Sequence, residues 1–305
     1  MTQASGGIDV GGTKIEARLF APDMAEIARY RIPLPRGDYA GIIAAVCDMV
    51  GWLRGQGGDD LAVGIGLPGV IDPATGQATT ANLPATGRPI TAEIADRAGG
   101  RIAFANDCKL FTLSESIGGA ADGADTAVGL VIGTGIGGGV VHRGRLVTGM
   151  GGLPGEVGHI AAPAHLGLPV LRCGCGAVGC YETLLSGEGV ARLALSLTGE
   201  AVPSVDVFTR AAAGDAAMAG VVDQWFALLA ELLLILNLTI DPDVIVLGGG
   251  VSTVPGLADR TQSLIDARVL TGTRAPRIRI AQFGDASGAR GAALFALQSS
   301  TKETT

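Results

Sequence analysis

The sequence predicts an α/β fold made of two domains. Its 305 residues approach the length at which a single hydrophobic core stops growing. Hydrophobic residues make up 48% of the chain and charged residues only 17%, so a large core can be buried. Short β-prone runs alternate with loops and helical patterns along the chain, and this alternation is typical of α/β proteins.

The first half of the chain opens with a predicted β-hairpin at residues 8–20. A helix is expected at residues 39–54, because apolar side chains recur there at helical spacing. Strands are predicted at residues 61–67 and 101–105, and a helix at residues 109–116 completes this half.

A stretch of small residues at 118–124 predicts a domain boundary. We expect a first domain of residues 1–118, joined by the last helix at 288–298, and a second domain of residues 119–287. The elements expected in the second domain are a glycine-rich hairpin at 127–147, a loop-like region at 149–179, helices at 189–197, 205–213 and 217–238, and a buried strand at 244–247.

Charge and hydropathy narrow the classes of protein that this chain can be. A net charge of −7 argues against a nucleic-acid-binding surface that covers the whole protein. Residues 1–5 show no basic segment with an apolar run behind it, so we expect no secretory signal and a cytoplasmic location. The longest apolar region, residues 221–240, is interrupted by Asp223, Gln224, Glu231 and Asn237, which favours a buried helix over a membrane span.

A glycine-rich turn in the segment IDVGGTK joins the two strands of the first hairpin. Glycine leaves consecutive backbone N–H groups accessible, and such groups bind anions, above all phosphates. Asp9 would then lie near the metal that accompanies the phosphate, because Mg²⁺ prefers one or two carboxylates plus phosphate oxygens and water. An ordinary hairpin turn is the alternative, and the pattern GxxxxGK[ST] of a P-loop is not met.

A second glycine-rich turn spans residues 133–138 and formally matches the dinucleotide pattern GxGxxG. A dinucleotide site should open a helix, whereas Val140 and Val141 continue a β-like pattern here. We therefore interpret the two turns as a pair that grips one polyphosphate. Three glycines after residue 247 would let a flat base or ribose approach the backbone.

Asn106 and Asp107 stand at the end of a predicted strand, where ligands bind in α/β sheets. A carboxylate in this position can accept the proton of a substrate hydroxyl, as phosphoryl transfer requires. The alternative is a helix N-cap, since Asn and Asp are both common caps. The two roles are compatible.

One histidine and three cysteines fall within 22 residues, in the order His159, Cys173, Cys175 and Cys180. These side chains suit a tetrahedral Zn²⁺ site, and four protein ligands would make it structural. The alternative is three buried thiols, and His165 could replace His159 as the ligand. We expect Cys47 and Cys108 to be buried apolar residues and His142 to lie on the surface.

Taken together, these motifs resemble the ROK family of bacterial sugar kinases and related repressors. The matching segments are IDVGGTK, GIGLPG, FANDCKL, GTGIGGG, PGEVGH, CGCGAVGC with Glu182, and PDVIVLGGG. They occur in family order across nearly the whole chain. Residues 81–89 and the loop before Arg172 look most like the N-acetylglucosamine kinases of the family.

The resemblance implies an actin-like, or ribonuclease H-like, fold with ATP in a cleft between two α/β domains. It implies ATP-dependent phosphorylation of the 6-hydroxyl of N-acetylglucosamine, with ATP and Mg²⁺ as cofactors and a structural Zn²⁺. A homodimer that binds a sugar, and neither nucleic acid nor membrane, is the expected form.

The resemblance also assigns roles to residues. Asp107 matches the catalytic base, and the positions that match sugar contacts are Asn82, Asn106, Asp107, Glu156, His159 and Glu182. Phosphate and nucleotide contacts are expected at Asp9, Gly11, Gly12, Thr13, Lys14, Gly133, Thr134, Gly135, Gly137, Gly138, Gly249 and Gly250. The zinc ligands would be His159, Cys173, Cys175 and Cys180.

Other functions within the family remain as alternatives. A glucokinase, or a kinase of another hexose or of N-acetylmannosamine, would use the same motifs. A repressor is disfavoured because only about seven residues precede Ile8, too few for a helix-turn-helix module. A non-catalytic sugar sensor is disfavoured because Asp107 is present. The family usually has small residues after Asn-Asp, whereas Cys108 and Lys109 follow here, and we expect Lys109 to point to solvent rather than to a phosphate.

Overall fold

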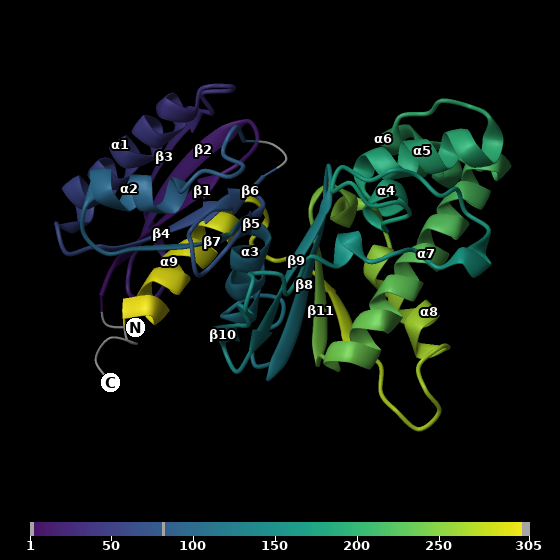
Figure 1. Cartoon of the computed structure of the whole chain (residues 1–305). Helices are drawn as coiled ribbons and strands as arrows, with labels where there is room; N and C mark the ends of the chain where they lie inside the picture. The colour runs from purple at the N-terminus through teal and green to yellow at the C-terminus, as the bar shows by residue number, and fades with distance from the viewer. Residues whose placement is uncertain (1–2, 81–82, 301–305) are drawn as a thin grey trace. The chain divides into compact units, whose positions relative to one another are not determined.

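The computed structural model describes residues 3–80 and 83–300 and divides into two compact units (Figure 1). The first unit is built from three separate stretches of chain, Met1–Asp122, Gly139–Pro154 and Phe283–Thr305. The second unit comprises Gly123–Gly138 and Gly155–Gln282. Asn82, one of the expected sugar contacts, lies outside the described residues.

A five-stranded sheet forms the centre of the first unit, with the strand order β3-β2-β1-β4-β7. The strands are β1 (Ser5–Val10), β2 (Lys14–Phe20), β3 (Glu26–Pro33), β4 (Ala62–Leu67) and β7 (Ile102–Asn106). β1 and β2 form the antiparallel hairpin expected around the first glycine turn, and β3 extends it. β4 runs parallel to both β1 and β7, so the carboxyl ends of these three strands meet at one edge of the sheet. Asp9 and Asn106 stand near that edge.

Helices cover both faces of this sheet. α1 (Tyr39–Gly57) and α2 (Ile90–Ala98) pack into one core with the apolar side chains of β1, β2 and β4. α9 (Ser287–Ser300) packs on β1 and β4, and also against α3 (Asp107–Ser116). Side chains alternate across a strand, so Ile8 and Val10 enter the α1 core while Gly7 and Asp9 face α9.

Two glycines allow α9 to lie directly on the sheet. A Cβ at Gly7 would stand 1.8 Å from the carbonyl oxygen of Ala289, and a Cβ at Gly64 would stand 1.9 Å from that of Ala292. These atoms belong to the backbone of a packed helix, so moving them would cost free energy. The first turn of α9 therefore approaches β1 closely, and a Cβ at Gly288 would meet the Asp9 carboxylate at 2.7 Å.

A second five-stranded sheet has the order β10-β9-β8-β11-β12. Its strands are β8 (Thr126–Ile132), β9 (Ile136–His142), β10 (Arg145–Leu146), β11 (Val244–Gly248) and β12 (Arg277–Ile280), and a separate two-stranded sheet joins β5 (Val70–Ile71) to β6 (Ala78–Thr79). β11 runs parallel to β8 and β12. The carboxyl ends of β8 and β11 therefore lie side by side, which brings the turn after Ile132 next to Gly249.

The helices of the second unit are α4 (Glu182–Leu185), α5 (Gly187–Thr198), α6 (Ser204–Ala212), α7 (Ala216–Ile240) and α8 (Leu257–Asp266), with short 3₁₀ turns η1 (Val157–His159), η2 (Ala164–Leu166) and η3 (Gly250–Thr253). α7 is long and apolar enough to cross a membrane by length and composition. Its side chains Trp225, Leu229 and Leu233 are fully buried, and the helix packs against α4, α5, α6 and α8. This burial agrees with the core helix that the sequence predicts.

The predicted α/β class and the main elements are confirmed, with boundaries that differ by a few residues. The longer elements that went unpredicted are β3, α2, α8 and β12, and the short β5, β6 and α4 also went unpredicted. β3 is mostly exposed, and α2 and α8 bury only two or three side chains each, so none has a strong apolar pattern. β12 has four residues, of which only Ile278 is buried.

Candidate active site

Asn106 and Asp107 occupy the junction between β7 and α3 in the first unit. The Asn106 side chain caps α3, since its Oδ1 accepts a hydrogen bond of 3.1 Å from the Lys109 amide. Its Nδ2 donates to the carbonyl oxygen of Gly69 at 2.9 Å. The N-cap interpretation is thus confirmed, and this cap fixes the first turn of α3 that carries Asp107.

The Asp107 carboxylate is partly buried and belongs to a pair of acidic groups with Asp9. Burial raises the pKa of Asp107, while a 2.8 Å hydrogen bond from the Cys108 amide to Oδ1 opposes that rise. The pKa of Asp9 is raised to about 7, first by burial and then by the charge of Asp107. Two partly buried carboxylates repel each other, so this pair favours the binding of a proton or a cation.

The first glycine turn lies beside this pair. Gly11 donates its amide to the carbonyl oxygen of Lys14 at 2.9 Å, which closes the hairpin, while Gly12 and Thr13 are exposed. The ammonium group of Lys14 lies 3.1 Å from Oδ2 of Asp285. The turn is therefore an open backbone loop with one cation at its end.

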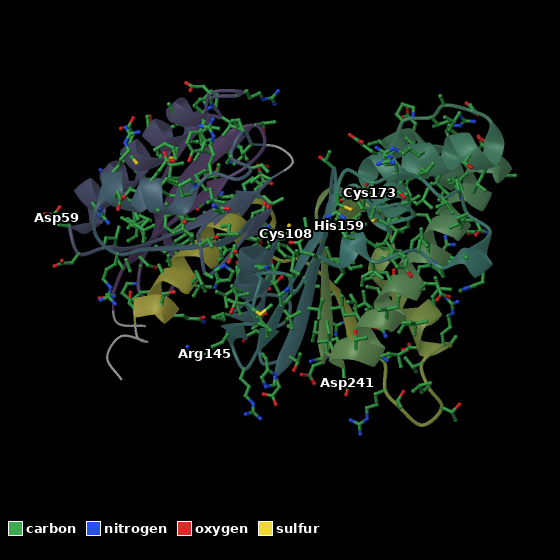
Figure 2. All side chains as sticks on the ribbon, in the orientation of Figure 1. Asp59, Cys108, Arg145, His159, Cys173 and Asp241 are labelled. Atoms are coloured by element: carbon green, nitrogen blue, oxygen red, sulfur yellow. The ribbon has the colours of Figure 1, made fainter. Side chains whose placement is uncertain are left out.

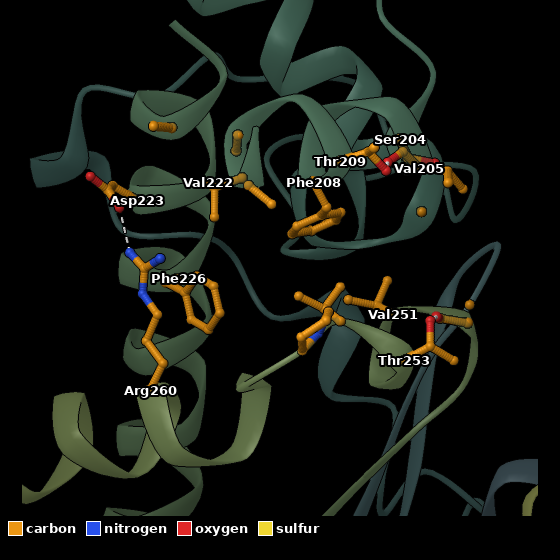
Figure 3. Close-up of a pocket in the computed structure, with 18 of the residues that line it drawn as sticks. Ser204, Val205, Phe208, Thr209, Val222, Asp223, Phe226, Val251, Thr253 and Arg260 are labelled. Carbon is orange, nitrogen blue, oxygen red and sulfur yellow. Dashed lines mark hydrogen bonds and ion pairs between the residues drawn. The ribbon is translucent and has the colours of Figure 1, made fainter. Parts of the chain in front are cut away.

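The second glycine turn, residues 133–135, borders the main cavity of the second unit. This cavity has a volume of about 990 Å³, and Gly133, Thr134 and Gly250 line it. Phe208, Phe226 and Val251 supply apolar walls, and Arg260 forms an ion pair with Asp223 beside the ring of Phe226 (Figure 3). A strand, β9, follows the turn, so the structure agrees that this is not the strand-turn-helix of a dinucleotide site.

Two carboxylates of the second unit stand at the beginnings of short helical turns. Glu156 precedes η1 and is partly buried. Glu182 begins α4, and its Oε2 accepts a 2.9 Å hydrogen bond from the amide of Ile136, the first residue of β9. Glu182 thus contacts the strand that follows the second glycine turn.

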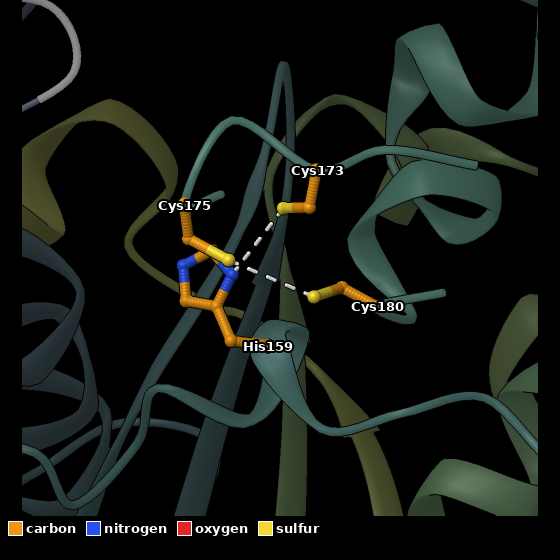
Figure 4. A group of neighbouring side chains, drawn as sticks. All are labelled: His159, Cys173, Cys175 and Cys180. Atoms are coloured by element: carbon orange, nitrogen blue, oxygen red, sulfur yellow. Dashed lines mark hydrogen bonds between the residues drawn. The ribbon is translucent and has the colours of Figure 1, made fainter. Parts of the chain in front are cut away.

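The predicted cysteine and histidine ligands converge (Figure 4). One ligand atom from each of His159, Cys173, Cys175 and Cys180 lies within 4.8 Å of the others. His159 Nδ1 stands 3.6 Å from Cys173 Sγ, and the sulfur atoms of Cys175 and Cys180 are 3.7 Å apart. A tetrahedral Zn²⁺ with Zn–S bonds of about 2.3 Å holds its sulfurs about 3.8 Å apart, so this donor set fits zinc.

The structure also decides between the two candidate histidines. His159 lies beside Cys173 (Figure 2), whereas His165 is exposed and its Nε2 stands 3.6 Å from Glu231. Cys173 and Cys180 are buried and Cys175 is exposed, so the three thiols are not a simple buried group. His142 lies on the surface as expected.

Three other expectations about single side chains require correction. Lys109 is buried and donates a hydrogen bond to the carbonyl oxygen of Gly152, so it does not point to solvent. Lys109 stands in the first turn of α3, and its side chain meets the loop of residues 149–154 there. Cys47 and Cys108 are only partly buried.

Sequence patterns did not reveal the residues that shape the cavity or neutralise Lys14. Phe208, Phe226 and Arg260 come from three different helices, and on a helix such residues resemble ordinary core or surface positions. Asp285 is separated from Lys14 by most of the chain. No local spacing connects residues that only the tertiary fold brings together.

Similarity to known proteins agrees with this geometry. The model of the ROK family matches residues 5–299. The chain is 37% identical to the N-acetyl-D-glucosamine kinase of Pectobacterium atrosepticum, over 95% of this chain and 98% of that protein. It is 35% identical to an N-acetylgalactosamine kinase of Shewanella sp. strain ANA-3, over 95% of both chains.

Solved structures show the same fold. The ROK hexokinase of Thermus thermophilus has a TM-score of 0.88 and 32% identity, with 98% of this chain and 100% of that chain covered. The ROK-family glucokinase of Streptomyces griseus, in complex with glucose and AMPPNP, has a TM-score of 0.79 and 27% identity, covering 97% of this chain and 99% of that one. The family-model match and these likenesses extend over nearly the whole chain, and this protein is a member of the ROK family.

Proposed function

We propose that this protein is an ATP-dependent kinase that transfers the γ-phosphate to the 6-hydroxyl of N-acetylglucosamine. The observation that carries the proposal is the partly buried Asp107 carboxylate, held at the carboxyl end of β7 by the Asn106 cap. A similar protein of Pectobacterium atrosepticum is named N-acetyl-D-glucosamine kinase, which supports this choice of sugar.

Asp107 would act as the general base. Burial raises its pKa, and a carboxylate with a raised pKa accepts the proton of a sugar hydroxyl more readily than an exposed one. The Cys108 amide donates to Oδ1 and helps to orient the carboxylate. Since positioning supplies much of the rate in phosphoryl transfer, the capped junction of β7 and α3 would contribute by holding Asp107 in place.

Asp9 would hold the Mg²⁺ that accompanies ATP. Burial and the charge of Asp107 raise the pKa of Asp9 to about 7. A bound divalent cation would stabilise the ionised carboxylate. Mg²⁺ also accepts water and phosphate oxygens as ligands, so one protein carboxylate suffices. When bound, Mg²⁺ neutralises charge on the phosphates.

The nucleotide would occupy the cavity of the second unit. Its apolar walls at Phe208 and Val251 suit a planar base, and the glycine turn at its edge presents backbone N–H groups. We assign phosphate contacts to Gly133, Thr134 and Gly135 of the second turn, to Gly137 and Gly138 at the start of β9, to Gly249 and Gly250 after β11, and to Gly11, Gly12, Thr13 and Lys14 of the first turn. Within each unit these residues come from the same edge of the sheet.

Sugar selection would depend on polar groups that match hydroxyls. A site that hydrogen-bonds an uncharged sugar needs carboxylates and amides, and Asn106, Glu156 and Glu182 supply them, while His159 would add a ring nitrogen. We also keep Asn82 in this group on the family resemblance. N-acetylgalactosamine is a second candidate substrate, because a relative of similar identity is named for it. Glucose is a third.

The cluster of His159, Cys173, Cys175 and Cys180 would bind a structural Zn²⁺. Four protein ligands close the coordination shell, so no position remains for a substrate. The loop between His159 and Cys180 has little regular structure, and a metal would hold it in one conformation. We further propose a homodimeric, cytoplasmic enzyme without nucleic-acid or membrane partners.

A sugar panel tests the proposal. ADP release would be measured with ATP and Mg²⁺ against N-acetylglucosamine, N-acetylgalactosamine, N-acetylmannosamine, glucose and fructose. We expect the highest kcat/KM with N-acetylglucosamine. A higher kcat/KM with any other sugar of the panel would move the assignment to that sugar, and no ADP release with any would end the kinase proposal.

A further inference from the structure

We propose that Glu182 is a positioning residue that holds the second glycine turn, residues 133–135, in the conformation that binds nucleotide phosphates. This inference rests on the proposed function for its ligand, because it assumes that the turn contacts a nucleotide. It adds a role for Glu182 beyond sugar binding. The two roles are separable, since one acts on the sugar and the other acts on the nucleotide.

The first contact lies at the end of the turn. Oε2 of Glu182 accepts a 2.9 Å hydrogen bond from the amide of Ile136. A Cβ at Gly135 would lie 2.6 Å from the same oxygen, so the carboxylate fits against the turn only because Gly135 has no side chain. The hydrogen bond is charge-assisted and therefore stronger than one to a neutral acceptor.

The second contact lies at the beginning of the turn. The chain leaves α4 at Leu185, and two residues later the amide of Gly187 donates to the carbonyl oxygen of Gly133 at 2.7 Å. Gly133 in turn donates its amide to the carbonyl oxygen of Gly135 at 2.9 Å. The segment of residues 182–187 therefore contacts both ends of the turn.

This segment is itself firmly held. The amide and the hydroxyl of Thr183 both donate to the carbonyl oxygen of Cys180, at 3.0 and 2.8 Å. The indole of Trp225, which is fully buried, donates to the carbonyl oxygen of Leu185 at 3.0 Å. Oε1 of Glu182 lies 3.6 Å from Cys173 Sγ, so the carboxylate stands between the cysteine cluster and the glycine turn.

A glycine turn needs such support. Glycine loses more conformational freedom than any other residue when it is ordered. Backbone N–H groups bind phosphate more tightly when the loop is already ordered, because a ligand that has to order the loop binds with lower affinity. Within residues 133–136, Thr134 has the only polar side chain, and Glu182 supplies an external acceptor.

Three variants of Glu182 separate the roles. Glu182→Ala removes the acceptor, and Glu182→Asp keeps the charge but withdraws the oxygens by one methylene from Ile136. Glu182→Gln keeps an oxygen at the same reach. ADP affinity would be measured by calorimetry without sugar, and exchange of the Ile136 amide by hydrogen exchange. Glu156→Gln is the matched control, because it alters another proposed sugar contact of the same unit.

We expect the Ala and Asp variants to lose ADP affinity about tenfold or more and to exchange the Ile136 amide faster. Glu182→Gln should lose less than either of these variants, because it keeps an acceptor but not the charge, and Glu156→Gln should remain close to wild type in both measurements. A sugar contact alone would not change ADP binding in the absence of sugar. If the Ala variant does not fold, the Asp and Gln variants decide the question in the same way.

Wild-type ADP affinity and wild-type exchange in the Asp variant would overturn the inference. Should the wild-type protein not bind ADP, the proposed function fails while exchange still decides the positioning role. Faster exchange at Ile136 in the variants would then support the role, and unchanged exchange would remove it.

Discussion

The carboxylates of Asp9 and Asp107 interact within the first unit, but different groups surround them. Asp107 accepts a backbone hydrogen bond at the start of α3. Asp9 faces the first turn of α9, where Gly288 leaves room for its carboxylate. The charge of Asp107 contributes to the raised pKa of Asp9, so the two residues form one electrostatic unit.

Replacement of Asp107 by Asn tests its role as a base. The amide oxygen can still accept from the Cys108 amide, so the local structure should persist. We expect kcat to fall by about 10²–10⁴-fold, because the variant cannot accept a proton. Sugar affinity by calorimetry should change little. A variant with near wild-type turnover would remove Asp107 as the base.

The pH dependence of stability tests the environment of Asp9. The pKa is about 7 in the folded protein against 3.8 for an ordinary Asp, so the folded state binds this proton more tightly than the unfolded state. The stability that the proton supplies is fully present below pH 3.8 and is lost as the pH rises to about 7. In EDTA, the Tm of Asp9→Asn minus that of wild type should therefore increase from pH 3.8 to about pH 7 and stay constant above it.

The control for Asp9→Asn is Asp48→Asn, which changes an exposed residue of α1. Its Tm difference from wild type should stay flat over the same pH range. Parallel curves for the Asp9 variant and the wild type would contradict the raised pKa.

Among the elements, α9 depends most clearly on residues far away in the chain. It lies against Gly7 and Gly64, which come from two adjacent strands. We expect Gly64→Ala to lower the free energy of unfolding by about 1–3 kcal/mol or more, since its Cβ would meet the backbone of Ala292. Chemical denaturation measures this change.

The matched control is Gly51→Ala in the exposed middle of α1, where a Cβ meets nothing within 4 Å. It should stabilise the protein by about 0.5–1 kcal/mol, because Ala favours a helix over Gly. Equal effects of the two substitutions would show that α9 does not pack on Gly64 as described.

The loop of the cysteine cluster should depend on its metal. We expect about one zinc per chain by elemental analysis, lost at acidic pH as thiolates and imidazole take up protons. Cys175→Ser changes an exposed ligand and should lower zinc content and Tm, whereas Cys47→Ser should leave zinc content unchanged. Purified protein without zinc and with unchanged stability would contradict the metal site.

At the scale of the whole molecule, the sequence predicted those features whose residues lie close together in the chain. The two glycine turns, the β7–α3 junction with Asp107 and the cysteine cluster all lie within short segments. The α/β class followed from the same alternation of elements. The capping role of Asn106 and the convergence of the three cysteines with His159 could therefore be predicted from the sequence.

Features that depend on packing could not be predicted in this way. Lys109 looks exposed in the sequence, yet it is buried and donates to the carbonyl oxygen of Gly152, which stands 43 residues away in the chain. Glu182 resembles a simple ligand in sequence, and only the fold shows its hydrogen bond to Ile136. The cavity walls at Phe208 and Phe226 look like core residues, because an aromatic side chain suits a core as well as a ligand.

The most direct test of the central claim is the structure of the reaction product. The protein would be incubated with ATP, Mg²⁺ and N-acetylglucosamine, and the products would be examined by phosphorus and proton magnetic resonance. We expect ADP and a sugar phosphate in equal amounts, with the phosphate on the 6-oxygen. ADP without sugar phosphate, phosphate on another oxygen, or no reaction would contradict the account.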